Sequence, residues 1–372
     1  MSEHTNPNRL LSLDAFRGLT IAGMILVNNP GTWSAVYPPL RHAAWHGWTP
    51  TDLIFPFFLF IVGVAMTFSF AHRLARGDSK TKLYLKVIRR TLIIFGLGLF
   101  LNGFPYFNLS TIRIPGVLQR IALCYFFASI VTLEMRIKGQ AIIAAFLLIL
   151  YWVLMKLVPV PGYGAGVLEP EGNLAAYIDN ALLHGHLWKP TWDPEGLLST
   201  LPAISTTLLG VLTGHWLHSS RSPIEKAAGL LVMGNFGLVV GVILDICFPI
   251  NKYLWTSSYV VFMAGMALNF LGVCYWLIDV KGYQRWATPF LIYGTNAIAV
   301  YVLSSLVAEI MTTWKVTGAD GSEMQLKTYL FEKLFASWAS PINASLFFAL
   351  TYVLIWLGLM ALLYRKRIFI KI

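Results

Sequence analysis

Long apolar segments separated by short polar clusters make up most of the chain. The segments are bounded by glycine, proline, asparagine or charged residues, and most are close to the roughly 20 residues that an α-helix needs to cross a bilayer. This pattern predicts an all-α, polytopic integral membrane protein with about ten transmembrane helices. The predicted spans are 14–29, 50–71, 85–102, 115–134, 140–157, 197–217, 227–248, 255–278, 288–313 and 342–364.

The composition excludes a soluble globular protein. Hydrophobic residues make up 57% of the 372 positions and charged residues only 12%, which a water-facing surface of this size could not tolerate. Because no polar linker or low-complexity tract divides the chain, we predict a single transmembrane domain over residues 1–372.

The net charge of +11 would suggest nucleic-acid binding on a soluble domain, but in a membrane protein it first indicates topology. If both termini are cytoplasmic, 19 of the 28 Lys and Arg residues fall on the inner side. The positive-inside rule therefore predicts this orientation, with outer segments at about 30–49, 158–196 and 314–341. Nucleic acid is not expected as a partner.

Candidate chemistry concentrates in the first outer segment. His42 there could act as a general base, because an imidazole titrates near working pH. The alternative is an interfacial histidine beside Trp45 and Trp48, which are typical of the headgroup belt. Asn28, at the end of the first span, could orient an imidazole or donate to an oxyanion. It could equally well satisfy a helix C-terminus.

Asp52 is interpreted mainly as a helix cap. Thr49, Pro50 and Asp52 have the spacing of a capping box at the start of the second span. An acid role for Asp52 is left open, because its charge also suits the positive end of the helix dipole.

No metal is expected. His184 and His186 could resemble a metal pair, but no third ligand is specified. Cys124, Cys247 and Cys274 lie in apolar runs without CxxC or CxxxH spacing, so they predict neither a zinc site nor a disulfide framework. The motifs of nucleotide hydrolysis, serine hydrolysis and zinc proteolysis are absent from the sequence.

Polar residues inside predicted spans indicate a polar passage through the helices. Gln119, Arg120 and Asn296 would be costly in hydrocarbon unless they face the bundle interior. Near the inner side, Arg17 could contact a phosphate or pair with Asp14. The basic cluster at 73–90, which includes Arg89 and Arg90, is first a positive-inside signal, and it would also attract a polyanionic cytosolic ligand.

A set of short motifs follows in order along the chain. They are Leu13-Asp-Ala-Phe-Arg-Gly18, Val27-Asn28, His42-Ala-Ala-Trp45 with Gly47, Asp52-Leu-Ile-Phe-Pro56, Arg113-Ile-Pro-Gly-Val-Leu-Gln-Arg120, Asp193-Pro-Glu-Gly-Leu197, Asn251-Lys-Tyr-Leu-Trp255 and Asn296. In this order they resemble the motifs of the heparan-α-glucosaminide N-acetyltransferase family of transmembrane acyltransferases, including its shorter bacterial members.

The resemblance implies an enzyme that uses cytosolic acetyl-CoA to acetylate the amine of a glucosamine-type sugar across the membrane. It places the active histidine on His42 and the assisting asparagine on Asn28. The sequence departs from the family at Asn29-Pro30, where glycines are usual. A periplasmic amino sugar is therefore expected as the acceptor instead of heparan, and the bacterial inner membrane as the location.

We therefore predict an N-acetyltransferase with His42 as general base, Asn28 as its helper and acetyl-CoA as co-substrate. An acetylated His42 intermediate stays open as a variant. The candidate acetyl-CoA-binding residues are Arg17, Arg89, Arg90, Arg120 and Asn296. Membrane lipid is an expected partner, and a homodimer is left open. The alternative from another class is an amino-sugar transporter of the inner membrane, which would use the same polar passage.

Overall fold

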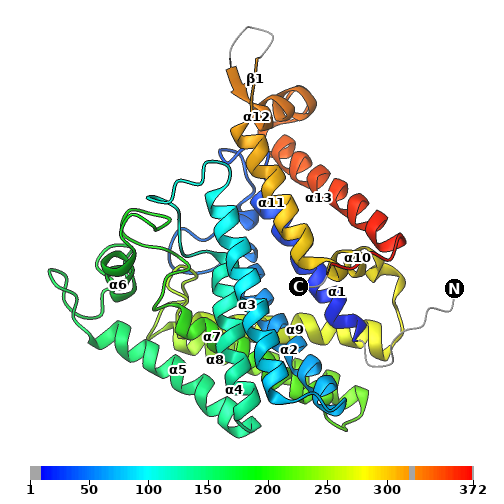
Figure 1. The fold of residues 1–372 in the computed structure, drawn as a ribbon. Coiled ribbons are helices and arrows are strands. Elements are labelled where there is room, and N and C mark those ends of the chain that lie inside the picture. The colour runs from blue at the N-terminus through cyan, green and yellow to red at the C-terminus, as the bar shows by residue number, and fades with distance from the viewer. Residues whose placement is uncertain (1–9, 318–322, 371–372) are drawn as a thin grey trace.

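The computed structural model describes residues 10–317 and 323–370 of the chain. The extreme termini, which we expected to be cytoplasmic, lie outside these ranges. The described part is mostly helical (Figure 1). Its longer helices are α1 (Leu11–Asn28), α2 (Ile54–Ala75), α3 (Lys80–Gly103), α4 (Val117–Glu134), α5 (Ile137–Leu157), α6 (Leu174–Leu183), α7 (Thr200–His218), α8 (Pro223–Asp245), α9 (Ser257–Tyr275), α10 (Thr288–Thr295), α11 (Ala297–Thr313) and α13 (Pro341–Arg365). Shorter helical segments are η1 (Pro38–Leu40), η2 (Pro50–Leu53), η3 (Trp276–Val280), η4 (Arg285–Ala287), α12 (Leu326–Phe331) and η5 (Glu332–Ala336).

Each of the ten predicted spans coincides with helix. Within the described residues, seven helices are long and apolar enough to cross a membrane, and an eighth span results if α10 and α11, bent by 73° at their junction, count as one. The other two predicted spans are α3 and α7, with 24 and 19 residues, which do not reach the same apolarity. A multi-pass helical membrane protein is thus confirmed, whereas ten crossings remain a prediction.

A small β-hairpin interrupts the helical pattern in the last predicted outer segment. Strand β1 (Lys315–Thr317) pairs antiparallel with β2 (Glu323–Gln325), with Val316 opposite Met324. The hairpin and α12 extend beyond the ends of α11 and α13 (Figure 1). The sequence analysis did not predict these strands, because three-residue strands are too short for a period-2 pattern to be recognised.

Small residues allow the helices to approach closely. A Cβ atom added to Gly63 of α2 would lie 2.0 Å from the carbonyl oxygen of Thr207 in α7. One added to Gly294 of α10 would lie 2.1 Å from the carbonyl oxygen of Asp14 in α1. Such contacts between backbones hold membrane helices together where the hydrophobic effect contributes little. Glycine is therefore required at both crossings.

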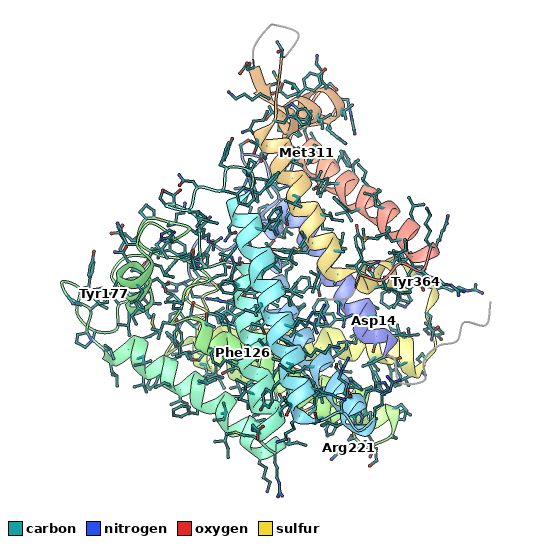
Figure 2. The ribbon with its side chains drawn as sticks, in the orientation of Figure 1. Asp14, Phe126, Tyr177, Arg221, Met311 and Tyr364 are labelled. Carbon is teal, nitrogen blue, oxygen red and sulfur yellow. The ribbon has the colours of Figure 1, made fainter. Side chains whose placement is uncertain are left out.

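One predicted inner segment lies far from a helix end that precedes a predicted outer segment. Figure 2 shows Arg221, in the turn between α7 and α8, near the lower edge, and Met311, near the end of α11, in the upper part, below the hairpin. Arg221 belongs to a predicted inner segment, and Met311 precedes the outer segment 314–341. The arrangement agrees with the predicted order of crossings, while the side that each end faces stays a prediction.

Candidate functional site

His42 lies in the connection between α1 and α2 and contacts the start of α2. Its Nδ1 atom lies 2.6 Å from Oδ1 of Asp52 in η2. The Asp52 side chain is fully buried, whereas that of His42 is 35% exposed. Because Asp52 accepts a hydrogen bond from Nδ1, the lone pair of the neutral imidazole is assigned to Nε2. This pair can orient a base toward an accessible substrate.

Asp52 also caps the helix that it begins. Its Oδ2 atom accepts hydrogen bonds from the backbone nitrogens of Thr49, at 2.9 Å, and Ala43, at 3.1 Å. The predicted capping box with Thr49 is therefore confirmed. The hydroxyl of Tyr259 in α9 donates to the Asp52 backbone carbonyl at 2.6 Å. The structure thus gives one carboxylate two tasks, since Asp52 both caps the helix and holds His42.

Lys252 completes the polar contacts of His42. Its Nζ atom lies 3.0 Å from Nδ1 and 3.1 Å from Nε2 of the imidazole, and 3.7 Å from Oδ1 of Asp52. The side chain is only 13% exposed. Burial lowers the pKa of Lys252, while the negative charges of Asp52 and Glu195 act in the opposite direction. Sequence reasoning assigned no role to this lysine, although it lies in one of the quoted motifs.

The connection from α8 to α9 fixes Lys252 against the His42 segment. The side chain of the preceding residue, Asn251, is fully buried, and its Oδ1 atom accepts a hydrogen bond from the backbone nitrogen of Leu254 at 2.9 Å. The nitrogen of Gly47 donates to the carbonyl of Ile250 at 2.7 Å. Gly47 has φ +89°, a conformation that other residues adopt only with strain. The two segments are therefore held in register.

An aromatic cluster borders the same site. The rings of Trp45 and Tyr253 stack with centroids 5.3 Å apart and planes 8° apart. Trp192 packs edge-on against both rings. The Tyr253 hydroxyl donates to the carbonyl of Ala43, next to His42, at 3.2 Å. Trp45 thus packs in an aromatic cluster beside His42. This packing does not exclude a position at the level of the lipid headgroups.

The motifs at 113–120 and 193–197 meet in one ionic cluster near Lys252. Arg113, before α4, donates from Nε and Nη2 to the two carboxylate oxygens of Asp193 at 2.8 and 2.6 Å. It also bonds Glu195. Burial acts to lower the pKa of Arg113, but the two carboxylates outweigh it and raise that pKa overall. The bidentate geometry fixes the 193–199 segment.

Arg120 lies at this end of α4, beside the 193–199 segment. It is 1% exposed, donates from Nη2 to the carbonyl of Gly196 at 3.0 Å and to Ser199, and lies 5.1 Å from the ring of Trp255. Its Nε and Nη1 atoms have no hydrogen-bond partner among the described residues, and neither has Nε2 of Gln119. Both residues are therefore buried donors with unsatisfied N–H groups, as the predicted polar passage requires.

Arg89 and Arg90 lie on α3, which packs beside α4 (Figure 1). Arg90 lies over the ring of Tyr125 at 4.9 Å, and its buried Nε atom also has no partner among the described residues. Arg89 is exposed. Arg90 therefore adds a third donor to those of Gln119 and Arg120.

The structure does not connect Asn28 with His42. Asn28 ends α1 and lines a cavity of about 260 Å³ together with Trp33, Glu309 and Lys327. Among the described residues, no hydrogen bond joins Asn28 to His42. Its role as a helper of the base therefore stays a prediction.

Arg17 and Asn296 make contacts within the protein. Arg17 donates from Nη1 to Oδ1 of Asp14 at 2.7 Å and to the carbonyl of Gly294 at 3.3 Å. Asn296 is fully buried at the break between α10 and α11. Its amide bonds the backbone of Ile368 at 3.1 Å and of Ile370 at 2.8 Å. These contacts give both side chains a structural task, and acetyl-CoA binding by either stays a prediction.

His184 and His186 do not converge on a common point. Nδ1 of His184 lies 2.9 Å from Oδ1 of Asn180, and Nδ1 of His186 lies 2.7 Å from the carbonyl of Ile112. Over residues 10–317 and 323–370, no group of three or more His, Cys, Asp or Glu side chains could hold a metal ion.

Comparison with known proteins agrees with these motifs. The sequence model of a family described as heparan-alpha-glucosaminide N-acetyltransferase, catalytic, matches residues 9–240. The chain is 29% identical to heparan-alpha-glucosaminide N-acetyltransferase of Mus musculus over 428 aligned positions, which cover 100% of this chain and 62% of that protein. It is 30% identical to the Homo sapiens protein of the same name over 423 positions, covering 98% and 60%. The chain thus spans about three fifths of the length of these relatives. It belongs to the heparan-alpha-glucosaminide N-acetyltransferase family.

Proposed function

We propose that the protein is a transmembrane N-acetyltransferase of the bacterial inner membrane, built as one domain. It transfers the acetyl group of cytosolic acetyl-CoA to the amine of a glucosamine-type sugar on the periplasmic side. The observation that carries this proposal is the contact of 2.6 Å between His42 and the buried Asp52. Family membership supports the reaction type.

The site supplies the proton transfer that the reaction needs. An amino sugar is an ammonium ion at neutral pH and must lose a proton before its nitrogen can attack a thioester. Nε2 of His42 accepts that proton, and Asp52 stabilises the imidazolium that forms, as a carboxylate does in a catalytic triad. The acceptor nitrogen then bonds the carbonyl carbon, and the bond to sulfur breaks. The CoA thiolate takes the proton from Nε2, and the nitrogen releases its second excess proton to solvent to leave the amide.

Helices α3 and α4 offer buried hydrogen-bond donors that acetyl-CoA could use. Unsatisfied buried N–H groups cost free energy, and Arg90, Gln119 and Arg120 carry such groups on the adjacent helices α3 and α4. The amide and phosphate oxygens of acetyl-CoA are acceptors that would satisfy them. A cofactor entering from the cytoplasmic face along these donors would bring its thioester toward the start of α4, where Arg120 lies over the ring of Trp255, three residues after Lys252.

The aromatic cluster of Trp45, Trp192 and Tyr253 suits the acceptor. A sugar presents C–H groups on one face and hydroxyls at its edge, which packed rings with polar tips can accommodate together. Because Tyr253 bonds the carbonyl of Ala43, a sugar placed on this cluster would hold its amine near His42.

An amino-sugar transporter remains the second candidate because α10 and α11 form a helix pair bent by 73°. Broken helices commonly build the substrate sites of transporters. Here, however, backbone groups of Ile368 and Ile370 bond the Asn296 amide at the break. This contact supports a structural break, and we therefore favour the acetyltransferase.

The test is acetyl transfer from acetyl-CoA to glucosamine by the purified protein, comparing wild type with His42→Ala, Asp52→Asn and His46→Ala at equal folded concentration. Loss of a general base should lower kcat by about 10²–10⁴, and Asp52→Asn, which can retain a capping interaction, should also lower it strongly. His46→Ala is the matched control from the same segment, because this histidine contacts Asn251 and Glu169 instead of Asp52. A His42→Ala variant with more than about half of the wild-type rate would contradict the mechanism. Glucosamine uptake without acetylation would instead favour the transporter.

A further inference from the structure

We propose that Lys252 is a second catalytic group, whose ammonium binds the oxyanion formed when the acceptor amine attacks the thioester. The inference rests on the proposed acetyl transfer and adds a residue to it. It starts from the position of Nζ, which lies 3.1 Å from the same Nε2 atom that is assigned as the proton acceptor.

The hydrogen bonds of the site leave the ammonium available. An ammonium has three N–H groups, and the described residues within hydrogen-bonding distance of Nζ are limited to the His42 imidazole. Oδ1 of Asp52, at 3.7 Å, is beyond a normal hydrogen bond. Even with one N–H group assigned to the imidazole and one to Asp52, the third is free for a ligand, in a side chain that is only 13% exposed. A donor in such a partly desolvated place interacts strongly with developing charge.

The contact with Nε2 suggests what happens when substrates enter. Nζ lies 3.0 Å from Nδ1 and 3.1 Å from Nε2, so it sits beside the ring between the two nitrogens and leaves the outward direction of the Nε2 lone pair open to the acceptor ammonium. The four-carbon stem of lysine allows a small displacement, which moves Nζ from Nε2 toward the carbonyl oxygen bonded to the attacked carbon. Asn28, the oxyanion donor suggested by the sequence, has no hydrogen bond to His42, whereas Lys252 lies against it.

The proposed step is balanced. The acceptor ammonium gives one proton to Nε2, and its nitrogen forms a bond to the carbonyl carbon. The carbonyl π electrons move to oxygen, which becomes the oxyanion bound by Lys252. Collapse restores the carbonyl and breaks the carbon–sulfur bond. The CoA thiolate takes the proton from Nε2, and the nitrogen, which still carries two hydrogens, releases one of them to solvent and becomes the neutral amide.

Lys252 also places a positive charge next to the imidazole of His42. A positive charge next to an imidazole disfavours a second positive charge. The charged and titratable groups facing Lys252 are Asp52 on η2, Glu195 on the 193–199 segment, Tyr253 on its own connection and His42 itself. The negative charges of Asp52 and Glu195 favour a proton on His42, whereas the positive charge of Lys252 disfavours it. Without the lysine, only the two carboxylates act on the imidazole. His42 then takes up its proton at a higher pH.

The experiment compares wild type with Lys252→Met, Lys252→Arg and Lys189→Met, an outer-segment lysine that packs on Trp188. Lys252→Met should lower kcat by about 10²–10³, should change KM for the acceptor by less than about threefold, and should move the acid limb of the pH–rate profile to higher pH. Lys252→Arg should recover part of the rate and keep the wild-type limb, even if Lys252→Met folds poorly. Lys189→Met should behave as wild type. An unchanged kcat in Lys252→Met, or a loss confined to KM, would overturn the inference.

A second readout does not depend on turnover. NMR of histidine-labelled protein follows the pH at which His42 takes up a proton, and we expect a higher value in Lys252→Met than in wild type. Equal titration in the two proteins would overturn the role of Lys252 beside His42, even if no amine is acetylated. Absence of acetyl transfer by wild type, with the titration shift present, would instead overturn the proposed function.

Discussion

The guanidinium of Arg113 and the carboxylate of Asp193, which are 80 positions apart in the sequence, meet through two hydrogen bonds of 2.8 and 2.6 Å. The Asp193 side chain is fully buried and also accepts hydrogen bonds from the backbone nitrogens of Trp188 and Glu195. Because the charge of Glu195 acts on Lys252, this contact links the start of α4 to the neighbourhood of His42. The Arg113–Asp193 pair therefore holds the segment that carries Glu195 in place and takes no part in the proton transfer.

Arg113→Ala should destabilise the fold strongly. Truncation leaves the buried carboxylate of Asp193 without its cation, and breaking a buried pair in this way typically costs about 3–5 kcal/mol. Thermal unfolding in detergent, followed by intrinsic fluorescence, measures the effect. Lys80→Ala is the control, because the Lys80–Glu134 pair is about half exposed and exposed pairs contribute about 0–1 kcal/mol. Equal losses in the two variants would mean that the Arg113 cluster does not stabilise the fold.

Arg90→Gln should weaken acetyl-CoA binding by about tenfold or more. The variant removes the charge and the buried Nε donor that lacks a partner among the described residues, and a hydrogen bond to a charged group contributes about 1.5–3 kcal/mol. Calorimetric titration at low and high salt measures the affinity. Lys82→Gln, an exposed change on the same helix, should have a much smaller effect. If both variants bind acetyl-CoA like wild type, the cofactor does not use the α3 donors.

The stability of the protein should fall as the pH rises from about 4 to about 7 through Asp179. This residue lies on α6, which carries the labelled Tyr177 in Figure 2, and burial raises its pKa from 3.8 to about 7. A carboxyl whose pKa is higher in the folded chain binds more protons when folded, so deprotonation favours the unfolded state over this interval. Above about pH 7 the effect is constant.

Asp179→Asn should therefore flatten this part of the pH profile and raise the melting temperature at pH 8. The amide oxygen can still accept the hydrogen bond that the backbone nitrogen of Leu197 donates to Oδ1 at 2.7 Å. Melting temperatures measured from pH 5 to 8 test the expectation. Glu171→Gln, an exposed residue of the same outer segment, controls for the loss of a negative charge. A variant that melts below wild type at pH 8 would show that burial of Asp179 is not the dominant effect.

The helices were predictable because membrane spans carry a strong local signal. The run predicted at 227–248 corresponds to α8 (Pro223–Asp245), and its bounds follow from polar residues that end an apolar stretch. Pro289 and Gly294 near Asn296 allow close packing or local unwinding at this point of the sequence, but the contacts that hold the break lie at 368–370, more than seventy residues away. Long-range contacts of this kind leave no periodic signal in a single sequence.

The candidate site was predictable in part for the same reason. Asp52 was identified as a cap because the capping box is local in sequence, but its contact with His42 depends on the path of the chain from 42 to 52. The contact between His42 and Lys252 joins residues 210 positions apart. The sequence named both motifs through the family resemblance, and only the folded chain brings the lysine to the imidazole.

The protein's own cysteine can test the side on which the site lies. Cys247 is exposed, whereas Cys124 and Cys274 are buried. The predicted span 227–248 includes it, but helix α8 ends at Asp245. Cys247 therefore lies in the connection to α9, five residues before Lys252, and shares the side of the membrane that the site faces. A membrane-impermeant maleimide should therefore label Cys247 in intact cells if the site is periplasmic. Cys247→Ser should abolish the signal, which excludes a contribution from the two buried thiols.

Labelling of Cys247 only after the membrane is opened would place the α8–α9 connection, and with it His42, on the cytoplasmic side. Acetyl transfer would then not cross the membrane.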